Sequence, residues 1–256
     1  MVVSFCLRLA AGLLLMLPLL NPAPIPPRFF RVHFLTALGL LAVTVYFLLD
    51  VATVGFWILY VCVALLCVVG SIVWHLDEAP GGRWLNWLTP IAMTACMIFA
   101  SFLPRGDMPS PPTERANGIR IADDAASALI LGSATTAMLM GHSYLISPAM
   151  SMSPLMRLLA ALAASLVLRI ALACVGLWWW TSSQGTSTLE TESLLWLSLR
   201  WLLGLIAPLV LAWMAWETAR IRSTQSATGI LYVVVIFCFL GELTSQLLLE
   251  KTGFIL

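Results

Sequence analysis

Three histidines are the residues of this sequence best suited to hold a redox cofactor. His33, His75 and His142 each lie within or beside a different long apolar run. A b-type haem takes two neutral imidazoles at matching depth on facing helices. If the runs cross a membrane in alternation, all three lie toward one surface, which we call side B. The sequence therefore predicts at most one haem b, with His142 as the preferred ligand and either of the other two as its partner.

The alternative to the haem hypothesis is that two of the histidines are interfacial residues at helix ends. His33 and His75 are close to the ends of their apolar runs, where polar side chains commonly reach for the membrane surface. His142 is set deeper, within the segment GHSYL. It is therefore the strongest of the three candidates.

Ionisable side chains interrupt three further apolar runs. Arg169, Arg200 and Glu242 would all lie in the half of the membrane opposite to the histidines, toward side A. Such groups cost a few kcal/mol each in hydrocarbon, so they usually face the bundle interior and find partners. Arg200 and Glu242 would each be about 12 Å below the surface, so these two could form an ion pair. Two interpretations remain open: an anion, quinone or proton site, or a structural ion pair between the last helices.

A polar line follows one face of the run from residue 123 to 147. Asp124, Thr135 and His142 share that face on a helical period. The distance from Asp124 to His142 is about 27 Å at 1.5 Å per residue, close to the hydrocarbon thickness of a bilayer. One helix could thus carry polar groups from one surface to the other.

The connection ETARIRSTQS, residues 217–226, is the densest polar motif on side B. Glu217, Arg220 and Arg222 could bind a phospholipid head group, a peptide partner or another anion. The competing interpretation is a solvated turn whose charges fix the orientation of the chain.

Composition identifies the class of protein. Of the 256 residues 61% are hydrophobic and 10% are charged, against about 25% charged in a soluble domain. This much apolar surface needs lipid as its solvent. The net charge is +1 and the sequence has no basic patch, so no nucleic-acid partner is expected. The six cysteines have no metal-ligand spacing, and no nucleotide-binding or hydrolase motif is present. We therefore expect no metal site, no catalytic residues and no catalytic activity of the chain on its own.

The expected fold is all-α: a polytopic integral membrane bundle of eight helices that forms a single transmembrane domain over residues 1–256. Seven helices remain if the first run, which contains Arg8, is a cleaved signal. Polar loops are expected at residues 104–122 and 181–191. The spans are expected at residues 2–20, 29–49, 54–74, 84–103, 123–147, 155–180, 193–216 and 227–249.

Three functions remain open on the sequence. The first is a membrane subunit of a redox or respiratory assembly that holds a haem b or a quinone at the His, Arg and Glu residues. The second is a small-molecule or ion transporter, and the third is a structural or assembly subunit without a ligand. Short loops favour partnership with other membrane subunits as well as with lipid. The strong preference for arginine over lysine favours a bacterial protein of the inner membrane.

Overall fold

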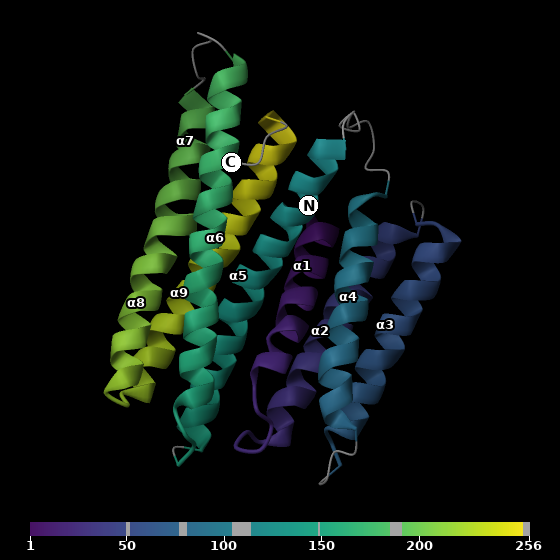
Figure 1. Ribbon diagram of the computed structural model, residues 1–256, viewed down its shortest axis with the longest axis vertical. Helices are drawn as coiled ribbons and strands as arrows, with labels where there is room; N and C mark the ends of the chain where they lie inside the picture. Colours follow the sequence, from purple (N-terminus) through teal and green to yellow (C-terminus); the bar gives the residue numbers. More distant parts are fainter. Residues whose placement is uncertain (50–51, 77–80, 104–113, 148, 185–190, 253–256) are drawn as a thin grey trace. The chain divides into compact units, whose positions relative to one another are not determined.

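A computed structural model describes residues 1–49, 52–76, 81–103, 114–147, 149–184 and 191–252 (Figure 1). Over these residues the chain is helical and has no strand. Eight helical stretches of the described chain are long and apolar enough to cross a membrane, which confirms the expected multi-pass helical bundle in contact with lipid. The helices are α1 (Val2–Leu15), α2 (Pro27–Leu48), α3 (Val54–Val73), α4 (Gly82–Ser101), α5 (Glu114–Ile146), α6 (Ser153–Gln184), α7 (Thr191–Trp201), α8 (Ala207–Arg220) and α9 (Thr224–Thr252).

Two helices extend beyond the spans expected from hydropathy. Helix α5 begins at Glu114, so the loop predicted for residues 104–122 is wrong in its second half; residues 104–113 lie outside the described part. Helix α6 continues to Gln184, although a loop was predicted from Thr181. Thr181 and Ser182 each donate a side-chain hydrogen bond to the carbonyl of Trp178 one turn earlier. The helix therefore continues through polar residues beyond the apolar segment. Hydropathy missed this extension because it indicates which residues prefer lipid and does not mark where a helix ends.

The seventh span is not one regular helix. Between α7 and α8 lies a π-helical turn, η2 (Leu202–Ile206), which the sequence prediction of an uninterrupted span at 193–216 missed. Pro208 lies in the first turn of α8. Proline has no backbone N–H, so the carbonyl of Gly204 lacks its usual partner four residues later. A wider turn at this point is a common response to such a break in the ladder.

The described chain divides into two compact units. The N-terminal unit comprises Val2–Gly132 and Ala149–Pro154; the C-terminal unit comprises Met1, Ser133–Pro148 and Leu155–Leu256. Helix α5 contributes its first part to one unit and its second part to the other. The expectation of one transmembrane domain stays a prediction.

In the N-terminal unit the helices α1, α2, α3 and α4 form a ring of neighbours, α1 with α2 and α4, and α3 with α2 and α4. Helix α1 also packs closely on α5. A Cβ on Gly12 would run into the backbone of Ala128 and Gly132, and a Cβ on Gly132 would run into the backbone of Gly12. Glycine at both positions therefore allows the two backbones to touch, as small residues do in membrane helix pairs.

In the C-terminal unit α9 is the central helix, with contacts to α7, η2 and α8. A second glycine pair, Gly204 on η2 and Gly241 on α9, brings those backbones together. Helices α6, α7 and α9 share a small apolar cluster in which Trp180 and Leu248 are buried. These close approaches fix the depth and rotation of the polar side chains on α6, α7 and α9.

Candidate functional site

A buried arginine on α1 organises the polar interior of the N-terminal unit. Arg8 Nε donates to Asp124 Oδ1 at 2.7 Å, and its Nη2 donates to Asp123 Oδ2 at 2.8 Å. Nη1 lies 3.4 Å from Ser127 Oγ. Arg8 and both aspartates are at most 4% exposed. The guanidinium is therefore held by two carboxylates of α5, in the charge-assisted geometry that makes arginine pairs strong.

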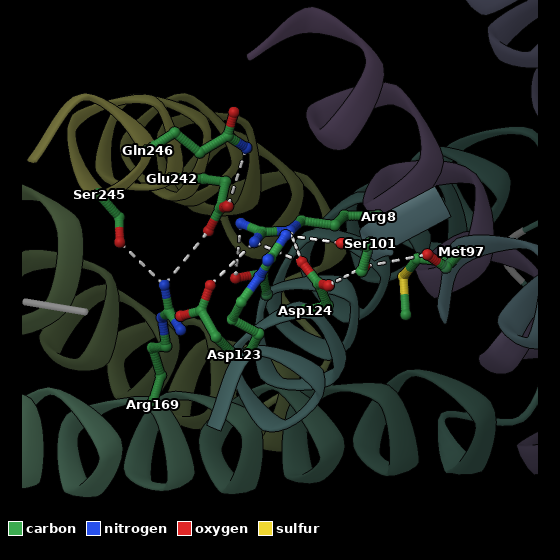
Figure 2. A network of polar contacts seen from close by, with 11 residues as sticks. Arg8, Met97, Ser101, Asp123, Asp124, Arg169, Glu242, Ser245 and Gln246 are labelled. Carbon is green, nitrogen blue, oxygen red and sulfur yellow. Dashed lines mark hydrogen bonds and ion pairs between the residues drawn. The ribbon is translucent and has the colours of Figure 1, made fainter. Parts of the chain in front are cut away.

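The same cluster reaches α4 through Ser101. The Ser101 hydroxyl is hydrogen-bonded to Asp124 Oδ2 and also lies 3.1 Å from the carbonyl of Met97 (Figure 2). Arg120, on the first part of α5, donates to the Ser101 carbonyl at 2.6 Å. Three helices are thus joined at this depth, because each polar group in the bundle must find its partner on a neighbour.

The C-terminal unit has its own buried arginine, Arg169 on α6, which is 0% exposed. Its Nη2 donates to Ser245 Oγ at 2.9 Å and lies 3.7 Å from Glu242 Oε2 (Figure 2). The amide of Gln246 donates to the other Glu242 oxygen, Oε1, at 3.1 Å. Glu242, Ser245 and Gln246 follow one another at the spacing of a single helix face, so α9 presents a continuous polar strip.

Arg200 on α7 is buried beside that strip. Its Nη1 donates to the carbonyl of Gly241 at 2.9 Å, and Thr244 Oγ1 donates to the same carbonyl at 2.9 Å. Glu242, the next residue, forms an ion pair with Arg169. The structure therefore brings all three predicted ionisable residues into the interior of one unit, where their partners include a carboxylate, a hydroxyl and a backbone carbonyl.

The three histidines have different surroundings. His33 is fully buried on α2, with Nδ1 2.8 Å from the carbonyl of Phe29. That bond requires a hydrogen on Nδ1, so in the neutral ring Nε2 carries the lone pair, which is the tautomer of a metal-bound histidine. His75 is exposed, and its Nδ1 lies 3.0 Å from Arg31 Nη1. Because a guanidinium only donates, neutral His75 has its hydrogen on Nε2 and its lone pair occupied.

His142 is exposed in the second part of α5, in the C-terminal unit. His33 and His75 both belong to the N-terminal unit, and their part in a haem site stays a prediction. Within the described residues no group of three or more His, Cys, Asp or Glu side chains could hold a metal ion. Haem b at a pair that includes His142 stays a prediction.

The members of the predicted polar line of α5 have different environments. Asp124 is buried in the Arg8 cluster, Thr135 is half-buried and His142 is exposed. The Thr135 hydroxyl is buried and has no hydrogen-bond partner among the described residues. Helical spacing therefore placed these groups in register, whereas neighbouring helices decide which of them is covered.

The predicted loop site forms the tight turn between α8 and α9. Arg220 Nη1 donates to Glu217 Oε1 at 3.1 Å, and both side chains are exposed. Arg222 is exposed and has a φ of 57°, in the left-handed region. The N–H groups of Arg222 and Ser223 close the end of α8 on the carbonyls of Ala219 and Thr218. This is a Schellman arrangement, with arginine at the position that glycine usually takes.

Several members of the two buried clusters were not predicted from the sequence. Arg8 resembles the charge that precedes the apolar core of a signal peptide, and this likeness hides its role in the interior. Arg8, Asp123 and Asp124 all lie toward the side-A end of their expected spans, and this signal could have identified the group. The neutral members Ser101, Ser127, Ser245 and Gln246 carry no such signal, because serine and glutamine also occur on solvated helix faces.

No family model, curated protein or solved structure matches the chain. The geometry of the described residues is therefore the basis for assigning a function.

Proposed function

We propose that the chain is an integral membrane subunit of a redox or respiratory-type assembly, with the polar strip of α9 and Arg169 as the site that handles a quinone head group or a proton. The observation that carries this proposal is the complete burial of the Arg169 guanidinium between Ser245 and Glu242. Burial of a cation within membrane-spanning helices costs free energy that its partners must offset, so such a residue is a candidate for a functional site. Polar oxygens of a quinone are suitable acceptors for it.

A haem b would add electron transfer to the same subunit. His33 supports this part of the proposal, since its buried ring has Nδ1 engaged by the Phe29 carbonyl. Its second ligand would come from a histidine of a partner subunit. When bound, such a haem would supply one-electron chemistry, and the chain would supply His33, burial and the surrounding polarity.

The test begins with the chain purified from its native membrane in mild detergent together with whatever subunits accompany it. We expect a reduced-minus-oxidised absorption band of b type, quinone in the lipid extract, or both, together with co-purifying membrane subunits. Arg169→Gln should lower the quinone content, and His33→Ala should remove a haem band. Glu217→Gln is the matched control, because that carboxylate is exposed in the α8–α9 turn. A colourless, quinone-free protein would contradict the proposal.

A small-molecule or ion transporter is the second candidate. The observation in its favour is that each compact unit has its own buried arginine–carboxylate cluster, Arg8 with Asp123 and Asp124 in one and Arg169 with Glu242 in the other. Paired intramembrane charges are typical of ion and substrate pathways. Solute movement into vesicles by a colourless protein, lost in Glu242→Gln, would favour it. A colourless protein that moves no solute and purifies only with partners would favour a structural subunit instead.

The location follows from the same proposal. A bacterial inner membrane would suit a respiratory assembly and the arginine-rich composition. Separation of bacterial inner and outer membranes, followed by immunodetection of the chain, tests this assignment.

A further inference from the structure

Gln246 has a buried amide that is only half satisfied. The side chain is 5% exposed, and Nε2 donates to Glu242 Oε1 at 3.1 Å. Its Oε1 has no hydrogen-bond partner within the described chain, and Figure 2 shows this oxygen directed away from Glu242. Most buried side-chain polar atoms in proteins do have a partner. The exception therefore needs a physical explanation.

The charge state of Glu242 explains the orientation of the amide. An ionised carboxylate has only acceptor atoms, so Gln246 must present its nitrogen and turn its oxygen elsewhere. A protonated carboxyl group has one O–H donor in addition to its carbonyl oxygen. A carboxylic acid and a primary amide can then form two hydrogen bonds side by side, acid O–H to amide oxygen and amide N–H to acid carbonyl.

We propose that Glu242 is a proton-binding site within the membrane-spanning helices and that Gln246 is the amide that receives the hydrogen bond of the bound proton. A proton taken from the aqueous phase forms one O–H bond on the Glu242 carboxylate, and no other covalent bond changes. Rotation of the Gln246 amide about its last torsion brings both of its polar atoms to the neutral carboxyl group. Proton binding thus supplies the donor that Gln246 Oε1 lacks.

The cations beside Glu242 oppose proton binding. Arg169 on α6 is 3.7 Å from Oε2 and favours the carboxylate. Arg200 on α7 reaches the carbonyl of Gly241, the preceding residue on α9. Cys238, buried one turn earlier on α9, is the other titratable side chain close to Glu242 on that helix. Loss of the negative charge would weaken the Arg169 contact, while the bond from Arg169 to Ser245 remains.

The two other helices of this unit bring no second carboxylate to the site among their described residues. Helix α8 has its charged side chains, Glu217 and Arg220, in its last turn. The part of α5 in this unit packs on α9 at Gly141 and Thr228, and its titratable side chains are the exposed His142 and the buried Tyr144. Within the described part of this unit, Arg169, Arg200 and the amide of Gln246 therefore all act on proton binding at Glu242.

The proposal rests on the proton role proposed above for the α9 strip, but it requires neither haem nor quinone. A colourless, quinone-free protein would therefore contradict the redox assignment and leave the proton site standing. The test is infrared difference spectroscopy of the full chain in lipid nanodiscs as the pH is lowered within the range where the helices persist. We expect the carbonyl band of a buried carboxylic acid to appear. In heavy water its frequency should shift, and the shift should develop slowly because hydrogen exchange at a buried group is slow. Glu242→Gln should abolish the band, whereas Glu217→Gln should leave it unchanged.

Gln246→Leu tests the role of the amide. The acid carbonyl then loses its hydrogen-bond donor, so its band should move to higher frequency. Ser198→Ala is the control and should leave the frequency in place, because that exposed hydroxyl bonds to the carbonyl of Leu195 in its own helix turn. Size-exclusion chromatography and circular dichroism check that each variant is folded. A spectrum in which Glu242→Gln removes no acid band would overturn the proton site. An unchanged band frequency in folded Gln246→Leu would overturn the role of the amide.

Discussion

Arg8 and Asp124 are 116 residues apart in the sequence and are joined by a hydrogen bond of 2.7 Å from Nε to Oδ1. The pair ties the first helix of the chain to α5. Asp124 also binds the Ser101 hydroxyl with its second oxygen, so one carboxylate links α1, α4 and α5. Arg8, the charge that gives the first apolar run its likeness to a signal peptide, is therefore buried in the interior of the N-terminal unit.

Removing the Arg8 guanidinium should destabilise the protein severely. Arg8→Met leaves Asp123 and Asp124 buried without this cation, and breaking a buried pair in this way costs about 3–5 kcal/mol. Arg8→Lys should rescue little, because a single ammonium cannot reproduce the forked contacts to both aspartates. Thermal or denaturant unfolding in detergent measures both changes.

Arg220→Gln is the control for Arg8. It breaks the exposed pair with Glu217, and such pairs contribute roughly 0–1 kcal/mol. Equal stability of Arg8→Met and the wild-type protein would contradict the buried cluster.

The bond between Arg169 and Ser245 should contribute measurably to stability. Ser245→Ala removes the hydroxyl that accepts from Arg169 at 2.9 Å, and hydrogen bonds to charged groups contribute about 1.5–3 kcal/mol. Ser198→Ala is the matched control, since that exposed hydroxyl bonds within its own helix turn, to the carbonyl of Leu195. It should change the free energy of unfolding by no more than about 0.5 kcal/mol. Equal effects of the two substitutions would show that the Arg169 contact is weak.

Alanine should have opposite effects on stability at Gly12, where α1 and α5 touch, and at Gly39, which has open space around it. Gly12→Ala places a methyl group against the backbone of Ala128, and overpacking of this kind costs about 1–3 kcal/mol. Gly39→Ala on α2 meets no atom within 4 Å, so the higher helix propensity of alanine should stabilise the protein by up to about 1 kcal/mol. Midpoints of thermal unfolding decide the matter, and the same sign for both substitutions would contradict the packing.

The turn after α8 predicts a stabilising substitution. Arg222 has a φ of 57°, a conformation that costs a non-glycine residue roughly 1–2 kcal/mol. Arg222→Gly removes this strain, but glycine also raises the conformational entropy of the unfolded chain, which offsets part of the stabilisation. We therefore expect a net stabilisation of about 0.5–1 kcal/mol. Arg220→Gly, at the helical end of α8, should destabilise it. A loss of stability in Arg222→Gly would mean that the arginine side chain has a stabilising contact in the membrane.

Hydropathy was sufficient to predict the eight membrane-spanning helices, because the free energy of placing a segment in lipid depends mainly on its own residues. Their ends were harder to predict, as the extension of α6 to Gln184 and the start of α5 at Glu114 show. The π-helical turn before Pro208 was missed for a related reason, since the turn depends on backbone bonds and on the approach of Gly204 to Gly241.

The sequence alone determined which side chains are chargeable within apolar runs and roughly how deep each one lies. Depth suggested Arg200 as a partner of Glu242, and the tertiary structure adds Arg169 as an ion-pair partner of Glu242 and the Gly241 carbonyl as an acceptor for Arg200. Likewise, only the packing of α1 on α5 brought Arg8 to Asp123 and Asp124. Depth follows from position along one helix, but partnership depends on how neighbouring helices are rotated about their axes. That rotation is decided by contacts between residues far apart in the chain.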